Sequence, residues 1–143
     1  MIVKGVNADA LTVATSSGDI KLDSVSSKDT RISANSGDVS LGDVVMDNID
    51  LKTSSGNITS GSIKAKCING RASSGDVMIR ECDASEINVV TTSGDVSIGI
   101  GSEMKYEYNT KTSSGDVNVP DSVEGADGKC NIETSSGDID VTQ

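Results

Sequence analysis

The chain has 143 residues, of which 22 are acidic and 12 are basic, and its formal net charge is −10 at pH 7. This charge disfavours nucleic acid and anionic membrane surfaces as partners, because both repel an acidic protein. No apolar run reaches the roughly 18 residues that a membrane-spanning helix needs, and the length predicts a single domain, residues 1–143.

Large aromatic rings and metal-binding side chains are scarce. Phe, Trp and His are absent, and the two aromatic residues are Tyr106 and Tyr108. The three cysteines contain no C-x-x-C pair, so neither a zinc motif nor a disulfide framework is predicted. Cys82 and Cys130 fall where other repeats have Val or Ile and are predicted to be small core residues, whereas Cys67 falls at a predicted corner.

From its first residues the chain follows one repeating pattern. A phrase of the type Ser-Ser-Gly-Asp-Ile returns seven times, with its glycine at Gly18, Gly37, Gly56, Gly75, Gly94, Gly115 and Gly137. Successive glycines are 19, 19, 19, 19, 21 and 22 residues apart. A period of this size indicates that each repeat is one structural unit stacked on the next.

Each repeat predicts short strands that meet at three corners. Apolar and polar side chains alternate within a strand, as the two faces of a β-strand require. At the corners the spacing of inward residues grows from two to three, and Gly, Asp, Asn, Ser or Pro occupies the turn. We therefore predict an all-β fold. It is a single-stranded right-handed β-helix, a three-sided β-solenoid with about 19 residues per coil and seven or more coils.

The same alternation predicts the core. The residues expected to point inward include Ile20, Leu22, Ile32, Val39, Leu41, Ile49, Leu51, Ile58, Ile68, Val77, Ile79, Ile87, Val89, Val96, Ile98, Val117, Val119, Ile132 and Ile139. The last two repeats are longer, with extra residues around 101–110 and 120–129. Corner insertions of this kind predict loops, where repeat folds usually carry specificity.

Both ends of the chain continue the core pattern. Met1, Val3 and Leu11 have core register at the start, and Ile139 and Val141 have it at the end. Because no capping segment is evident, we expect the chain to be part of a longer protein or to stack end to end with copies of itself. The alternative is that the short partial coils serve as caps.

Stacking would align one acidic or amide residue per coil at the first corner. Asp76, Asp95 and Asp116 in this column are weak calcium candidates, because calcium takes oxygen ligands. A hydrogen-bonded turn is the favoured interpretation, since the spacing lacks the repeat of calcium-binding β-rolls. We predict no metal and no cofactor.

A column of serines precedes the glycines, but it offers no catalytic machinery. Serine needs a general base to act as a nucleophile, and the chain has no His. Polysaccharide-active enzymes on β-helices work in clefts built by long loops, whereas the corners here are short. We therefore predict that the protein is not an enzyme, with a polysaccharide-active enzyme as the third hypothesis.

The longest side of the predicted coil presents a flat polar face. Asn69, Asn88, Asn109 and Asn131 share one outward column, and Lys52, Arg71 and Lys111 share another. These seven residues are the predicted binding residues, for a protein or a glycan. The alternative is a solvated sheet surface on which the asparagines stack without a ligand.

The recurring T-S-S-G-D-[IV]-x-[IVL] phrase resembles a bacterial family of β-strand-repeat proteins described as adhesins, whose function is largely unestablished. The resemblance covers essentially the whole chain. It implies a single-stranded right-handed β-helix and a role in the cell envelope, and it carries no catalytic or ligand residues to transfer. The leading hypothesis is thus a non-enzymatic, adhesin-like envelope module. The alternative is a cytoplasmic scaffold or regulatory module that docks a membrane protein, if Met1 is the natural start.

Overall fold

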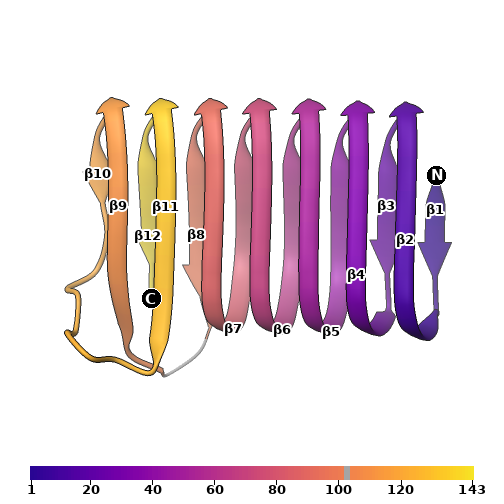
Figure 1. Ribbon diagram of the computed structural model, residues 1–143, viewed down its shortest axis with the longest axis horizontal. Helices are drawn as coiled ribbons and strands as arrows, with labels where there is room; N and C mark the ends of the chain where they lie inside the picture. The colour runs from indigo at the N-terminus through magenta and orange to yellow at the C-terminus, as the bar shows by residue number, and fades with distance from the viewer. Residues whose placement is uncertain (102–103) are drawn as a thin grey trace.

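The computed structural model describes residues 1–101 and 104–143 as a stack of parallel strands, with no helix among them (Figure 1). Every strand pair in it is parallel. The strands are β1 (Ile2–Lys4), β2 (Asn7–Ser17), β3 (Ile20–Asp23), β4 (Val25–Ser36), β5 (Val39–Ser55), β6 (Ile58–Ser74), β7 (Val77–Ser93), β8 (Val96–Ile100), β9 (Tyr106–Ser114), β10 (Val117–Asn118), β11 (Gly128–Ser136) and β12 (Ile139–Thr142).

One coil, β5, shows how the sequence pattern becomes a three-sided cross-section. As far as Thr53 its side chains alternate between buried and more exposed, except at two places where neither of two neighbours is buried. These places are residues 42–43 and 47–48, and the third turn is the Gly-Asn step at residues 56–57. Val39 pairs with Ile58 of the next coil, a step of one 19-residue period. The prediction of a β-solenoid is confirmed.

The hand of the winding can be followed in Figure 1. The long strands lie in front and run upward, the short strands lie behind and run downward, and the coils advance away from the N-terminus. This combination of rotation and advance is right-handed, as expected for crossovers between parallel strands.

The order of the last two coils differs from the sequence prediction. In space β11 lies between β7 and β9, and β12 lies between β8 and β10. Asn131 therefore pairs with Asn88 on one side and with Asn109 on the other. The expectation that each repeat stacks on its successor is wrong here. The chain passes over one coil position, builds β9–β10, and returns to fill the gap.

This return reverses the advance of the coil while the strands keep their direction. The connection from β10 to β11 is therefore left-handed, unlike the others (Figure 1). The start of β11 is joined to the residue before β9, since the Gly128 N–H donates to the Lys105 carbonyl oxygen at 3.1 Å.

We call β11–β12 the inserted coil, because it lies between β7–β8 and β9–β10. A buried tyrosine of β9 reaches across it to β7. Tyr106 of β9 is fully buried, and its hydroxyl donates to the carbonyl oxygen of Ala84 in β7. Gly128 of β11 lies beneath the ring, where an added Cβ would stand 2.5 Å from the ring's Cδ1 atom. Gly128 thus allows the tyrosine to reach across β11 to β7.

The core follows the predicted alternation, with two corrections at the end of the stack. The predicted inward residues are buried except for Val117, which is 42% exposed, and Val119, which is half-buried. Both belong to the β9–β10 coil, which has no further coil over it. Cys82 and Cys130 are buried as predicted, and Cys67 is half-buried.

The two ends of the stack are finished differently. At the N-terminal end Met1 and Ile2 are exposed, and Val3 and Leu11 are only partly covered. Ile139 and Val141, which the sequence order places at the other end, are buried inside the stack.

The end formed by β9 and β10 is partly covered by residues 119–127. Ser122 Oγ accepts a hydrogen bond from the Tyr108 N–H at 2.9 Å, and the Val123 N–H donates to the Tyr106 carbonyl oxygen at 3.0 Å. This segment therefore partly caps the edge of β9. In residues 1–101 and 104–143 no helix is long and apolar enough to cross a membrane.

Candidate functional site

The glycine column is a structural corner. Gly56 has φ +144°, and a Cβ added there would stand 2.1 Å from the carbonyl oxygen of Gly37. A Cβ added at any later glycine of the column would come equally close to the carbonyl oxygen of the glycine in an adjacent coil. In this column Gly137 stands between Gly94 and Gly115. Gly18 begins the column, with φ +111° and open space around its Cβ position. The glycines thus allow backbones of adjacent coils to approach closely.

The acidic column links neighbouring coils through their backbones. The Asp95 N–H donates to Asp76 Oδ1 at 2.9 Å, and the same bond recurs along the column at 2.8–3.0 Å. This differs from the turn cap that the sequence suggested, because the accepted proton comes from the next coil. Asp138 separates Asp95 from Asp116, so the three calcium candidates are not consecutive. Within the described residues no cluster of three or more His, Cys, Asp or Glu suits a metal.

The four predicted asparagines form one ladder on the long face. Asn88 Nδ2 donates to Asn69 Oδ1 at 3.1 Å, Asn131 Nδ2 donates to Asn88 Oδ1 at 2.8 Å, and Asn109 Nδ2 donates to Asn131 Oδ1 at 3.1 Å. The order along the ladder is therefore 69, 88, 131, 109. A primary amide has two N–H donors and an oxygen with two lone pairs, so the ladder bonds leave hydrogen-bonding capacity in Asn131 and Asn109. Asn88 also donates to Glu86 Oε1 at 2.9 Å, so its remaining capacity is on its oxygen.

The charged column beside the ladder is mixed. Lys52 and Arg71 are exposed register neighbours on β5 and β6, which places two positive charges side by side. Further along, Lys111 Nζ lies 3.5 Å from Glu133 Oε1. Val90 lies between Arg71 and Glu133 and is 44% exposed. Basic, apolar and acidic positions therefore succeed one another along this column.

The long face is hollowed, which the sequence prediction of a flat surface missed. A hollow of about 480 Å³ lies over β7, β11 and β9, and its lining includes Asn88, Asn109, Asn131, Lys111 and Glu133. It brings together four of the seven predicted binding residues. Asn69 lines a second hollow of about 290 Å³ nearer the N-terminus, while Lys52 and Arg71 line neither.

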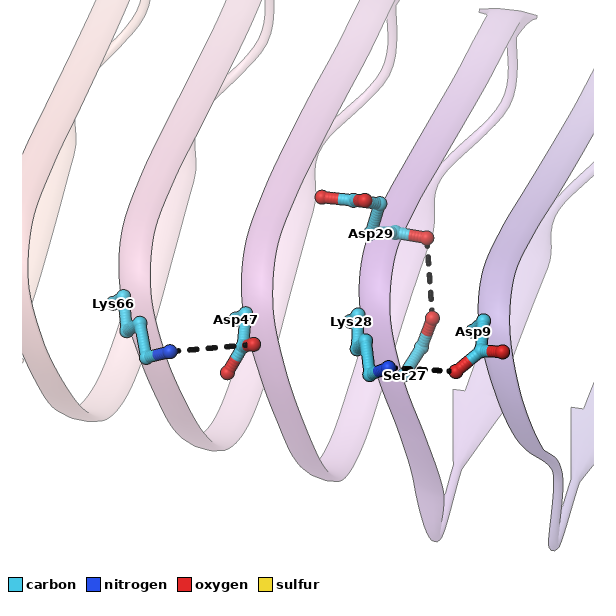
Figure 2. A network of polar contacts seen from close by, with 6 residues as sticks. All are labelled: Asp9, Ser27, Lys28, Asp29, Asp47 and Lys66. Carbon is cyan, nitrogen blue, oxygen red and sulfur yellow. Dashed lines mark hydrogen bonds and ion pairs between the residues drawn. The ribbon is translucent and has the colours of Figure 1, made fainter.

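The corner next to the long face carries a charge pattern that sequence reasoning overlooked. Lys28 Nζ lies 3.1 Å from Asp9 Oδ1, and Lys66 Nζ lies 3.3 Å from Asp47 Oδ2 (Figure 2). The signal was available, because the sign of the charge alternates at each 19-residue step. These pairs are exposed, and such pairs contribute little to stability, about 0–1 kcal/mol each.

The buried thiols are poor candidates for reactive groups. Burial raises the pKa of Cys82 to about 12 and the pKa of Cys130 to about 12. Burial also raises the pKa of the half-buried Cys67, with a further contribution from the Glu86 charge. Because the thiolate is the nucleophile and the metal ligand, raised pKa values keep these groups protonated and inert near neutral pH.

Comparison with known proteins identifies a family for this architecture. The model of the Toastrack family, DUF4097, matches residues 2–142. The chain therefore belongs to the Toastrack family, a β-repeat family of unknown function. No curated protein and no solved structure matches the chain. The β-solenoid fold fits a repeat module without enzymatic activity.

Proposed function

We propose that this member of the Toastrack family is a non-enzymatic, adhesin-like module of the bacterial cell envelope whose long face binds a protein or a glycan. The observation that carries the proposal is the hollow of about 480 Å³ over β7, β11 and β9, lined by the amides of Asn88, Asn131 and Asn109. A row of amides offers donors and acceptors at the spacing of the coils, about 4.8 Å.

The chemistry around the hollow suits a polar polymer. Hydroxyl groups of a glycan, or backbone groups of a peptide, can pair with the amide atoms that the ladder leaves free. Lys111 and Glu133 lie in the same lining and offer one charge of each sign. Val90 adds an exposed apolar contact at the edge of the ladder. Polar groups around a small apolar contact favour ligand binding over catalysis.

Two features support a non-enzymatic role. The serine column has no histidine near it to act as a base, since the chain contains none. The thiols of Cys82 and Cys130 are buried, with pKa values raised to about 12 by burial. A polysaccharide-active enzyme, the third hypothesis, would reveal itself by releasing reducing ends from a glycan panel.

The direct test is binding by the purified chain to a panel of bacterial surface polysaccharides and purified envelope proteins. We expect a ligand that the double variant Asn109→Ala/Lys111→Ala binds at least tenfold more weakly. Lys21→Ala, which removes a lysine from the short side of the coil, is the matched control and should bind as the unmodified protein does. Binding that the double variant retains in full would exclude the long face.

Localisation separates the envelope role from its alternative. The competing hypothesis is a cytoplasmic scaffold or regulatory module that docks a membrane protein. Fractionation of the full-length gene product, with markers for cytoplasm and envelope, distinguishes the two. We expect the protein in the envelope fraction, and a purely cytoplasmic protein would favour the scaffold.

A further inference from the structure

The inserted coil is held by its two neighbours through the same contacts that join all other coils. The Gly94 N–H donates to the Ser136 carbonyl oxygen at 3.0 Å, and the Gly137 N–H donates to the Ser114 carbonyl oxygen at 2.9 Å. Asp138 bonds to coils on both sides in the acidic column. The space between β7–β8 and β9–β10 is therefore a complete slot for one coil, which we call the coil slot.

The segment that delivers the coil to the slot is lightly attached. Residues 121–125 are exposed, and two hydrogen bonds join this segment to β9, through Ser122 and Val123. The step that the segment makes is left-handed, whereas about 98% of crossovers between parallel strands are right-handed. Residues 119–127 thus have the character of a hinge, with an unusual path and, among residues 1–101 and 104–143, two hydrogen bonds to β9.

We propose that two copies of this chain exchange their last coils. Residues 128–143 of one copy fill the coil slot of the other, and residues 119–127 act as the hinge. All the ladder contacts of β11 and β12 are kept in such a dimer, as in other domain-swapped pairs. The hinge loses its left-handed return and its two hydrogen bonds to β9.

The shape of the slot selects this coil over the others in the chain. At the level of Tyr106 the incoming strand must carry a glycine, because a Cβ there would stand 2.5 Å from the ring. Gly128 meets that requirement. The residues at the same position of the earlier coils all have side chains, and they are Asp9, Lys28, Asp47, Lys66 and Ser85. The occupant that fits is therefore the last coil of this chain or of a second copy.

Two chains with one introduced cysteine each provide the test, in a Cys67→Ser background that removes the half-buried thiol. Val90 and Glu133 are register partners on β7 and β11, at a spacing that a disulfide can bridge. Chains carrying Val90→Cys and chains carrying Glu133→Cys are mixed, refolded and oxidised at several protein concentrations. We expect a disulfide-linked heterodimer whose yield falls in proportion to dilution.

Two controls make the result decisive. The pair Val90→Cys and Lys111→Cys, on separate chains, should give no heterodimer, because Glu133 lies between these positions. Placing Val90→Cys and Glu133→Cys in one chain should give an internal disulfide at low concentration. If that internal disulfide forms but the mixed chains give no heterodimer at any concentration, the exchange does not occur. An internal disulfide in a single chain that carries Val90→Cys and Lys111→Cys would overturn the coil order and the proposal together, because Glu133 lies between these two positions.

The hinge is tested separately. Ser122→Ala removes the oxygen that accepts the Tyr108 N–H and should raise the heterodimer yield severalfold at a fixed concentration. Asp121→Ala changes the neighbouring exposed residue and should leave the yield unaltered. Equal yields for the two variants would contradict the assignment of residues 119–127 as the hinge.

Discussion

The coils from β1 to β8 and the coils from β9 to β12 have nearly the same phrases, yet they are assembled differently. In the first region each coil stacks on its predecessor with a 19-residue step. In the second region the last coil, β11–β12, lies between β7–β8 and the coil that precedes it in sequence, β9–β10. The ladders of the glycine, acidic and asparagine columns run through both regions without a break. A repeat phrase therefore specifies how coils join and leaves open which coils join.

The largest expected effect tests the close approach that both regions share. Gly56→Ala adds a Cβ 2.1 Å from the Gly37 carbonyl oxygen at a residue with φ +144°. We expect a loss of more than about 3 kcal/mol in the free energy of unfolding, from backbone strain and overpacking together. Urea denaturation followed by circular dichroism measures it.

Gly18→Ala is the matched control for this variant. Gly18 has φ +111° but nothing within 4 Å of its Cβ position. Gly18→Ala should therefore lose only the cost of the strained backbone, about 1–3 kcal/mol, without the added overpacking of Gly56→Ala. Equal losses in Gly56→Ala and Gly18→Ala would mean that the contact between coils does not contribute.

Alkaline pH compares one buried thiol from each region. Burial raises the pKa of Cys82 in β7 and of Cys130 in β11 from 9.0 to about 12. The folded state then favours the neutral thiol, so this stability is complete below pH 9 and declines as the pH rises from 9 toward 12. Each thiol should cost about 1.4 kcal/mol per pH unit in that window.

Urea titrations at pH 8, 9 and 10 measure this effect. Cys130→Ala should remove the part of the stability decline that comes from the inserted coil. Cys82→Ala should remove an equal part, which comes from the regular region. If neither variant reduces the decline between pH 9 and pH 10, the thiols are not its source.

A smaller effect addresses the rearranged region alone. Gly128→Ala forces a Cβ against the Tyr106 ring at 2.5 Å, and we expect a loss of about 1–3 kcal/mol from overpacking. Ser85→Ala alters the same corner position in the regular region, where the side chain is exposed, and should change stability by less than about 0.5 kcal/mol. Thermal and urea denaturation of both variants give the comparison. A neutral Gly128→Ala would place Tyr106 elsewhere and so contradict the inserted order.

The smallest effect is a gain in the regular region. Gly70 is buried without positive φ, and a Cβ there would meet Val89 Cγ2 at 3.7 Å, an ordinary contact. Gly70→Ala should therefore stabilise the protein by about 0.4–1 kcal/mol, chiefly by restricting the unfolded chain. Gly99→Ala is the contrast, because its Cβ would stand 2.1 Å from the Arg80 carbonyl oxygen. The denaturation midpoints should move in opposite directions, and a common direction would refute the packing described here.

Signals for the inserted order were present in the sequence but were not decisive. Pro120 closes the short side of the β9–β10 coil, and a proline cannot donate to the next ladder, which favours an edge position for its coil. Thr110 of β9 stands at the position where β11 has Ile132. The more apolar residue thus belongs to β11, which favours the interior position for that coil. Gly128 opposite Tyr106 was recognisable only once β9 and β11 were known to be neighbours.

Part of the candidate site was predictable for the same reason that the core was. Asn69, Asn88, Asn109 and Asn131 share one position of the repeat, so any stacking order brings them into one column. The hollow over β7, β11 and β9 was not predictable, since its lining depends on which coils are adjacent. The extra residues around 120–129 predict a specificity loop. In the structure residues 119–127 partly cover the end of the stack through Ser122 and Val123.

By itself the sequence determined the solenoid, its 19-residue coil, its corners and the identity of most core residues. It could do so because alternation within a strand and glycine at a close backbone approach are local requirements that every repeat states again. Only the tertiary structure decided the order of the last two coils, the left-handed return and the covered end. Parallel ladders between similar phrases have nearly the same contacts in either order, so the choice rests on a few unrepeated side chains such as Tyr106 and Gly128.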